Sequence, residues 1–286
     1  MATVSGTLQV PGHKVVQLLG NGARSTIWKV RNLTTGKFYA LKRVVKRERN
    51  DFRFIEQVEA EYANACKLDH PNLRKVLNLR RIRKWLAVSE IQLMMEYCEG
   101  ETIQNARPQS VPRVVSIFTK VASVLEHMNS RGVIHADTKP NNILLTENDE
   151  IKVIDLGQSC AAGTVKDRIQ GTPDFIAPEQ VHRQPLDART DVFNFGATLY
   201  WTLTGRAIPT ALRTEEIKMK HDHMLQPLAE VNPNVPPSLV KLVEDCIEAI
   251  PARRPSSMKE VASRLGLVTM TMQRKQQEAQ SANGVK

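Results

Sequence analysis

The stretch from residue 133 to residue 145 constrains this chain most, because it sets a polar loop between two short apolar segments. It reads Val-Ile-His-Ala-Asp-Thr-Lys-Pro-Asn-Asn-Ile-Leu-Leu. Pro140 lacks a backbone N–H and excludes a helix through the loop, so the apolar flanks are expected to be short buried strands. Asp137, Lys139 and Asn142 could accept a proton, neutralise an anion and hold a divalent cation. An isolated Asp-x-Lys is common in polar loops, so other parts of the chain must support such a site.

Length and composition allow two lobes or one large domain, since the chain has 286 residues of which 41% are hydrophobic. No run of about 18 apolar residues occurs, so no membrane insertion is expected. Residues 1–6 lack the charged and apolar regions of a secretory signal. The cysteines are widely spaced and form no Cys-x-x-Cys pair, which favours free thiols in a reducing, cytoplasmic compartment. They are Cys66, Cys98, Cys160 and Cys246.

The formal net charge of +10 is spread unevenly, because residues 41–84 hold 13 Lys or Arg against 6 Asp or Glu. Such a segment could bind nucleic acid, anionic lipid or an acidic protein. It could instead be a solvated face near a phosphate-binding site, which the charge pattern favours. No aromatic residues interleave with the charges in a stacking pattern, which argues against nucleic acid.

A glycine-rich turn lies between two strand-like segments, residues 13–19 and 26–30. This arrangement predicts a hairpin. Gly20 and Gly22, on either side of Asn21, would let the backbone approach a ligand and point N–H groups at phosphate oxygens. A lone Gly-x-Gly is usually just a turn. Strands on both sides favour a flap that covers a nucleotide over a Rossmann turn, which opens a helix.

A third strand is expected over residues 37–45, where alternation places Lys42 on the same face as small Ala40 and leaves space for a flat ligand. A strand lysine is by default a surface charge. Residues 51–68 carry helical apolar spacing, with Asp51 as the N-cap. This helix offers two candidate partners for Lys42, Glu59 and Glu61.

The remaining segments alternate between strands and helices. Strands are expected over 73–79 and 87–97 with an exposed turn at 80–84, and a short strand runs from Ile151 to Asp155. Helices are expected over 111–131, from a capping Thr190 through the almost wholly apolar 191–201, and from Pro236 to Ile250. Residues 1–10 are expected to be flexible and 267–286 to be a disordered tail. His221 and His223 have no third ligand nearby, so a surface helix is favoured there over a metal site.

In order and spacing, these segments resemble the eukaryotic-like serine/threonine protein kinases over roughly residues 13–266. Residues 135–142 resemble the catalytic loop His-Arg-Asp-x-x-x-x-Asn, with Ala136 in place of arginine. Tyr-Ala-Leu-Lys, ending at Lys42, resembles the Val-Ala-Ile-Lys strand of kinases, and Asp155-Leu156-Gly157 resembles Asp-Phe-Gly. Residues 171–179 resemble the close of the activation segment, and 251–255 the Pro-x-x-Arg-Pro element. Ser25 stands where the third glycine of the glycine-rich loop is usual.

The resemblance implies an α+β, bilobal protein-kinase-like fold. The N-lobe, about residues 11–97, would be a small antiparallel sheet with one main helix, and the C-lobe, about 101–266, would be mainly helical. It also implies an ATP-dependent serine/threonine protein kinase active in signal transduction. The implied cofactors are ATP and Mg²⁺ or Mn²⁺, and the implied partners are a protein substrate and a regulatory protein that supplies the input.

Site residues follow from the same resemblance. Asp137 would accept the substrate hydroxyl proton and Lys139 would stabilise the γ-phosphate, while Asn142 and Asp155 would hold the metal. Glu61 would hold Lys42, since it lies nine residues before His70, where the kinase helix glutamate sits. Met95 would close the back of the adenine pocket, although an ordinary buried strand end is the alternative there. The nucleotide contacts would be Leu19, Gly20, Asn21, Gly22, Ile27, Ala40, Lys42, Glu61, Met95, Glu96, Cys98 and Leu144.

In the C-lobe, the resemblance implies that Asp191 hydrogen-bonds the catalytic-loop backbone and that Arg254 pairs with Glu179. The arginine usual at position 136 can bind a phosphorylated activation-loop residue, and alanine cannot. The sequence therefore predicts activity that does not depend on phosphorylation of Thr164 or Thr172. Thr172 is expected to have a structural role beside Asp137 and Lys139.

Two alternatives remain beside an active protein kinase. A pseudokinase scaffold is disfavoured because Lys42, Asp137, Asn142 and Asp155 are all present. A small-molecule kinase of related fold is disfavoured because Ala-Pro-Glu at 177–179, Asp191 and Arg254 are the parts that build a peptide-binding platform.

Overall fold

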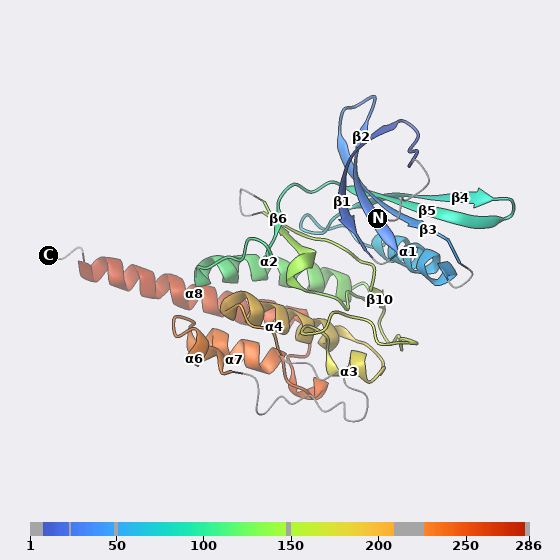
Figure 1. Cartoon of the computed structure of the whole chain (residues 1–286). Coiled ribbons are helices and arrows are strands. Elements are labelled where there is room, and N and C mark those ends of the chain that lie inside the picture. Colours follow the sequence, from blue (N-terminus) through green and yellow to red (C-terminus); the bar gives the residue numbers. More distant parts are fainter. Residues whose placement is uncertain (1–7, 23, 49–50, 147–149, 209–225, 284–286) are drawn as a thin grey trace. The chain divides into compact units, whose positions relative to one another are not determined.

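A computed structural model describes residues 8–22, 24–48, 51–146, 150–208 and 226–283 (Figure 1). The chain divides into two compact units. The first comprises Met1–Asp69 and Arg74–Glu99, and the second comprises His70–Leu73 and Gly100–Lys286. A strand-rich first unit and a mainly helical second unit confirm the expected bilobal α+β fold. His221 and His223 lie outside the described residues.

The first unit is built on a five-stranded antiparallel sheet with strand order β1-β2-β3-β5-β4. Its strands are β1 (His13–Asn21), β2 (Ser25–Asn32), β3 (Phe38–Val45), β4 (Val76–Lys84) and β5 (Ala87–Glu96). β3 is therefore flanked on both sides by partners, which fixes the register of the lysine-bearing strand.

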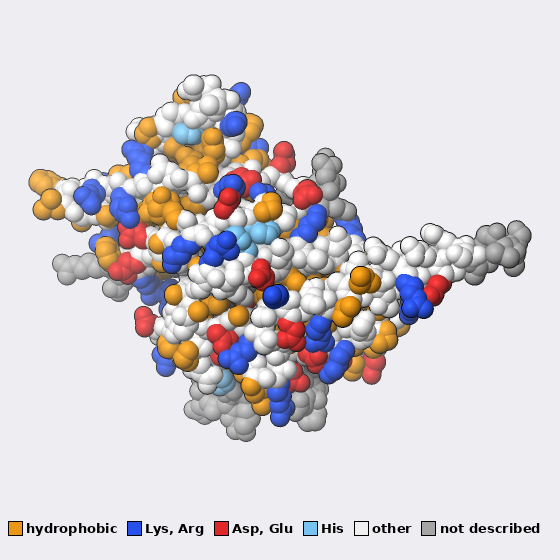
Figure 2. Space-filling model, turned by 180° about the vertical axis from the view of Figure 1, so that it is seen from behind, with side chains coloured by type: hydrophobic (Ala, Val, Ile, Leu, Met, Phe, Trp, Pro, Cys, Tyr) orange, Lys and Arg blue, Asp and Glu red, His pale blue; other side chains and the backbone are white. Residues whose placement is uncertain are grey.

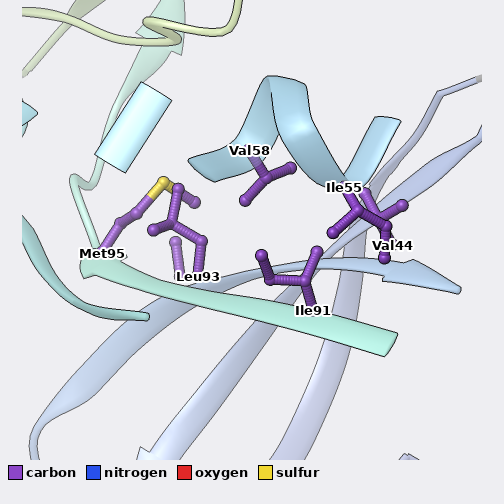
Figure 3. Packing of buried hydrophobic residues seen from close by; sticks show 7 residues of the cluster. Val44, Ile55, Val58, Ile91, Leu93 and Met95 are labelled. Atoms are coloured by element: carbon purple, nitrogen blue, oxygen red, sulfur yellow. The ribbon is translucent and has the colours of Figure 1, made fainter. Parts of the chain in front are cut away.

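Helix α1 (Phe52–Ala65) packs on this sheet through one apolar cluster, seen at close range in Figure 3. Ile55 and Val58 of the helix meet Val44, Ile91 and Leu93 of the strands. All five side chains are buried. Burial of side chains of this kind stabilises a fold by roughly 1.5–3 kcal/mol each. The cluster therefore holds α1 firmly against β3 and β5.

The expected turn at residues 80–84 is wrong, because β4 continues through Lys84. Arg80 pairs with Gln92 and Ile82 with Glu90. The true turn is Trp85–Leu86, whose side chains are 99% exposed. Figure 2 shows hydrophobic side chains at the end of this hairpin, with Lys and Arg beside them. β4 is an edge strand, and charged side chains are common on edges, so its basic composition looks like that of a turn.

Two expectations near the start of the chain also need correction. Residues 1–7 lie outside the described part, but Val10, expected to be flexible, is buried against Val30 and Leu41. Asp51 does not cap α1 with its side chain. Its carboxylate instead accepts hydrogen bonds from the backbone N–H groups of Arg47 and Glu48 at 2.9 and 3.0 Å.

Several of the cations in the basic segment 41–84 have acidic partners inside the first unit. The pairs are Lys42 with Glu61, Arg43 with Glu90, Arg81 with Glu59, and Lys75 with Asp69. Part of the local positive charge is thus neutralised within the fold.

The second unit is mainly helical. Its helices are α2 (Val111–Asn129), α3 (Pro178–Val181), α4 (Ala188–Thr204), α6 (Leu228–Val231), α7 (Pro237–Cys246) and α8 (Met258–Asn283), with single 3-10 turns η2 (Pro140–Asn142) and η3 (Pro251–Arg253). As predicted, α4 is buried on nearly all sides. A Cβ added at Gly196 would lie 2.5 Å from the Cβ of Cys246, so this glycine lets α4 and α7 approach closely.

The ends of two helices differ from expectation. α4 begins at Ala188 and is capped by Asp187, whose carboxylate accepts the Arg189 N–H, so Thr190 lies inside the helix. α7 ends at Cys246 rather than at Ile250. Ile250 is extended, as expected for a residue that precedes a proline.

The tail expected to be disordered from residue 267 is helical through Asn283. α8 packs along α2, and Val268 is buried in that contact region (Figure 1). Beyond it, glutamine, lysine, glutamate and alanine are good helix formers. Arg274 pairs with Glu278 one turn later. The polar composition is therefore that of an exposed helix. Among the described residues, no helix is long and apolar enough to span a bilayer.

Candidate active site

Short buried strands hold both ends of the polar loop, as predicted. β7 (Val133–Ile134) pairs with β10 (Cys160–Ala161) at its start. β8 (Ile143–Leu145) continues from its end and lies between β6 (Glu101–Thr102) and β9 (Ile151–Val153). The single turn η2 contains Pro140, at a helix start where its missing N–H costs nothing.

Asp137, Lys139 and Thr172 form a closed hydrogen-bonded triangle. The Lys139 Nζ donates to Asp137 Oδ2 at 2.8 Å and to Thr172 Oγ1 at 2.6 Å. The Thr172 hydroxyl donates to the other carboxylate oxygen, Oδ1, at 2.8 Å. Both oxygens of this nearly buried carboxylate are therefore oriented. Thr172 therefore lies beside Asp137 and Lys139, as predicted.

The backbone of the loop is held by Asp191 of α4. Its carboxylate accepts the N–H groups of His135 and Ala136 at 3.0 and 2.9 Å, and the Asn129 side-chain amide at 2.7 Å. Burial raises the pKa of Asp191, while these N–H donors oppose the rise. The Thr198 hydroxyl, also in α4, is shared between the Asn194 carbonyl at 2.7 Å and the Thr138 carbonyl at 3.0 Å.

Ala136 has φ +60°, in the left-handed region. For a residue with a Cβ this conformation costs roughly 1–2 kcal/mol. Such strain persists only where surrounding contacts over-determine it. Because Ala136 directly precedes Asp137, the contacts that hold it also orient the carboxylate.

Asn142 and Asp155 are linked through the backbone, since the Ile154 N–H donates to the Asn142 carbonyl at 2.8 Å. The Asn142 side-chain N–H donates to the Asp137 carbonyl at 2.8 Å, so the Asn142 side-chain oxygen points away from that carbonyl. Asp155, at φ +68°, accepts the Gly157 N–H at 3.1 Å. Amide and carboxylate oxygens suit Mg²⁺, which binds one or two carboxylates together with substrate phosphates. No cluster of three or more His, Cys, Asp or Glu that could hold a metal occurs in the described part of the chain. The Asn142 and Asp155 oxygens therefore fit a metal that takes its other ligands from phosphates.

In the first unit, the Lys42 ammonium lies 2.7 Å from the Glu61 carboxylate, which is 1% exposed. Glu59, the other candidate, contacts Arg81 instead. Ala40 precedes Lys42 by two residues in β3 and is buried. The chain thus presents a lysine whose ammonium is held by a buried carboxylate.

The other expected nucleotide contacts of the first unit lie on or beside the same sheet. Gly20 and Asn21 end β1, and Gly22 follows, its N–H bound to the Ser25 carbonyl at 2.8 Å. Ile27 pairs with Lys42 and Met95 with Ala40 across adjacent strands. Leu19, Glu96 and Cys98 lie in or just after these strands. Leu144 lies in β8 of the second unit, half-buried.

Buried polar residues that sequence reasoning missed also support the loop. Asn194 and Thr198 lie in the otherwise apolar α4, and Gln180 in α3. Buried polar side chains almost always have hydrogen-bond partners, so polar residues within an apolar helix were a usable signal for α4. No signal in the sequence singled out Gln180.

The second unit also contains a fully buried ion pair. Arg254 donates to both carboxylate oxygens of Glu179, at 2.7 and 2.9 Å. The same guanidinium reaches the carbonyls of Glu248, Arg189 and Ala249. This confirms the pairing implied by the resemblance, and it fastens the end of segment 171–179 to the chain before α8.

Comparison with known proteins agrees with this arrangement. The family model described as "Protein kinase domain" matches residues 13–265. The chain belongs to the protein kinase family and carries a serine/threonine protein kinase domain. Members of this family use ATP and a divalent metal.

Similar proteins include two probable serine/threonine-protein kinases, one from Clostridium acetobutylicum and one from Clostridium perfringens. The first is 28% identical over 92% of this chain and 41% of the relative, and the second 30% identical over 87% and 37%. The cAMP-dependent protein kinase type 3 of Saccharomyces cerevisiae is 30% identical over 70% of this chain and 50% of the relative. The chain thus spans half or less of the length of these relatives.

Proposed function

We propose that this chain transfers the γ-phosphate of ATP to serine or threonine hydroxyls of protein substrates, through a catalytic domain at about residues 11–266. The observation that carries the proposal is the triangle of Asp137, Lys139 and Thr172. Phosphoryl transfer needs positioning and charge neutralisation more than covalent chemistry, and this triangle supplies an oriented carboxylate beside an ammonium group.

In this proposal Asp137 orients the substrate hydroxyl and accepts its proton. Lys139 stabilises the charge that develops on the transferred phosphoryl group. The three N–H donors on Asp191 and the bond from Thr198 support the proposal, because they keep the loop backbone rigid around Asp137.

The proposal also assigns residues to the nucleotide. Lys42, steadied by Glu61, contacts the α- and β-phosphates, and the turn at Gly20 and Gly22 lets the backbone cover them closely. The apolar contacts for the adenine are Leu19, Ile27, Ala40, Met95 and Leu144, with backbone groups near Glu96 and Cys98 and the turn residue Asn21 completing the site. Asn142 and Asp155 would hold Mg²⁺, or Mn²⁺, which neutralises phosphate charge when bound.

The proposed setting is the cytoplasm, where ATP is available. All four cysteines are free thiols in the structure, which suits a reducing compartment. The proposed input is a regulatory protein partner. Affinity purification of the tagged chain from its own cells checks this, and recovery of no specific partner would count against it.

The test of catalysis is phosphate transfer from labelled ATP, with magnesium, to a generic basic protein. The intact chain and an Asp137→Asn variant are compared. Removal of a general base lowers rates by roughly 10²–10⁴-fold, so transfer by the variant should be nearly abolished. Equal transfer by both proteins would contradict the assignment of Asp137. No transfer by either would favour a binding scaffold, and label found only on a small metabolite would favour a small-molecule kinase.

A further inference from the structure

Gln180 joins three parts of the second unit: the catalytic loop, the segment 170–177 and helix α4. Its Nε2 donates to the carbonyls of Ala136 and Gln170 at 2.7 and 3.1 Å. Its Oε1 accepts from the Ala177 N–H at 3.0 Å and from Asn194 Nδ2 at 2.9 Å. A carboxamide has two N–H donors and two lone pairs on its oxygen, so all four bonding positions are occupied. The side chain is only 2% exposed, so water does not compete for them.

The four partners also fix which way the carboxamide points. Two are carbonyl oxygens and lie at the nitrogen, and two are N–H donors and lie at the oxygen. The opposite orientation would place the carboxamide oxygen against the two carbonyl oxygens. Asn194 adds support, because its Nδ2 also donates to the Phe175 carbonyl at 2.6 Å.

One of the Gln180 bonds reaches Ala136, the residue that precedes Asp137. The Ala136 N–H is bound by Asp191 and its carbonyl by Gln180. Ala136 is therefore gripped at both polar groups in its left-handed conformation, once from α4 and once from α3. Loss of the Gln180 bond would release one of these two restraints and let the Asp137 carboxylate move.

We infer that Gln180 is a positioning residue that fastens the segment 170–177 to the catalytic loop without a phosphorylated side chain. A phosphate orders a segment by pairing with arginine, and Ala136 offers no charge for such a pair. The Gln180 carboxamide makes the connection with neutral groups instead. This inference rests on the proposed kinase activity and specifies how the catalytic loop around Asp137 is held in position.

The first test uses Gln180→Met, which keeps an unbranched side chain of similar length and removes all four hydrogen bonds. Its matched control is Gln184→Met, since Gln184 is exposed and lies just past the same helix. Hydrogen–deuterium exchange of the Ala177 amide should become at least tenfold faster in Gln180→Met and stay unchanged in the control. The kcat for a protein substrate should fall at least tenfold. The KM for ATP should change less than twofold, because no proposed nucleotide contact bonds to Gln180.

The second test distinguishes the hydrogen bonds made by the carboxamide nitrogen from those made by its oxygen. Gln180→Glu keeps an oxygen facing Ala177 and Asn194 but turns a second oxygen toward the two carbonyls. We expect kcat to fall as in Gln180→Met while the Ala177 amide stays protected. This variant also decides the matter if Gln180→Met fails to fold.

Wild-type kcat in a folded Gln180→Met or Gln180→Glu variant would overturn the inference, as would an unchanged Ala177 exchange rate in Gln180→Met. An intact chain without any kinase activity would instead refute the proposed function. The exchange measurement would still report on the Gln180 connection in that case, so the two failures are distinguishable.

Discussion

Arg254 and Glu179 form a bidentate ion pair at 2.7 and 2.9 Å, although 75 positions separate them in the chain. The Arg254 side chain is 0% exposed and that of Glu179 is 5% exposed. Removal of one partner from a buried pair leaves an uncompensated charge and costs about 3–5 kcal/mol. We expect Arg254→Met to lower the free energy of unfolding by about that amount, measured by urea denaturation.

The matched control is Arg274→Met, which breaks the solvent-exposed pair with Glu278. Exposed ion pairs contribute little to stability, so this variant should unfold almost like the wild type. Similar losses in both variants would show that burial of the Glu179–Arg254 pair has no special importance.

Thr172→Val should lower kcat about 10- to 100-fold. The substitution keeps the shape of the side chain but removes the hydroxyl that bridges Asp137 and Lys139. Hydrogen bonds to charged groups are worth about 1.5–3 kcal/mol, which sets the size of the loss. Thr172→Ser keeps the hydroxyl and should retain most activity in a steady-state assay. A Thr172→Val enzyme as active as the wild type would rule out a role for this bridge.

Thr164→Ala should retain wild-type activity, and phosphatase treatment should leave the activity unchanged. The Thr164 hydroxyl donates to the Ala161 carbonyl at 2.6 Å, a local contact within its own turn. Ala136 provides no cation for a phosphate at this site. Phosphate transfer before and after phosphatase treatment measures this, and activity that depends on a phosphorylated Thr164 would contradict it.

Lys42→Met should weaken nucleotide binding and reduce kcat/KM about 100-fold or more. It removes the ammonium group assigned to the phosphates and leaves the buried Glu61 carboxylate without its ion-pair partner. Glu61→Gln keeps the size of the side chain and a hydrogen-bond acceptor, so its effect should be smaller. Titration with a fluorescent ATP analogue separates binding from turnover. Unchanged affinity in Lys42→Met would place the phosphates elsewhere.

Alkylation by iodoacetamide at pH 8 should modify Cys66 first and leave Cys160 and Cys246 intact while the chain is folded. Cys66 is exposed and the other two are buried. Burial raises the pKa of Cys160, and it raises that of Cys246 to about 12. A raised thiol pKa means less thiolate at pH 8, and the thiolate is the reactive form. Mass spectrometry of the labelled peptides checks the order, and early labelling of Cys246 would contradict its burial.

Expectations drawn from sequence were most accurate for contiguous patterns. The strands around the glycine turn, the strands that flank the polar loop and the helix expected over 111–131 all occur, and that helix ends two residues early, at Asn129. They depend on periodicity and on single residues such as Pro140, which act over a few positions. Expectations drawn from composition alone were weaker: the basic run at 80–84 proved to be strand, and the polar run after 267 proved to be helix.

The sequence by itself determined the family and the spacing of Asp137, Lys139 and Asn142, because these are properties of order along the chain. The resemblance already implied Glu61 as the partner of Lys42, and the tertiary structure confirms that contact. Only the tertiary structure decided that Glu59 pairs with Arg81 instead. It also revealed that the Gln180 side chain reaches Asn194 and Ala136, which lie 14 and 44 residues away. Hydrogen bonds of this kind form where the folded chain brings distant groups together and excludes water, and no local pattern records that proximity.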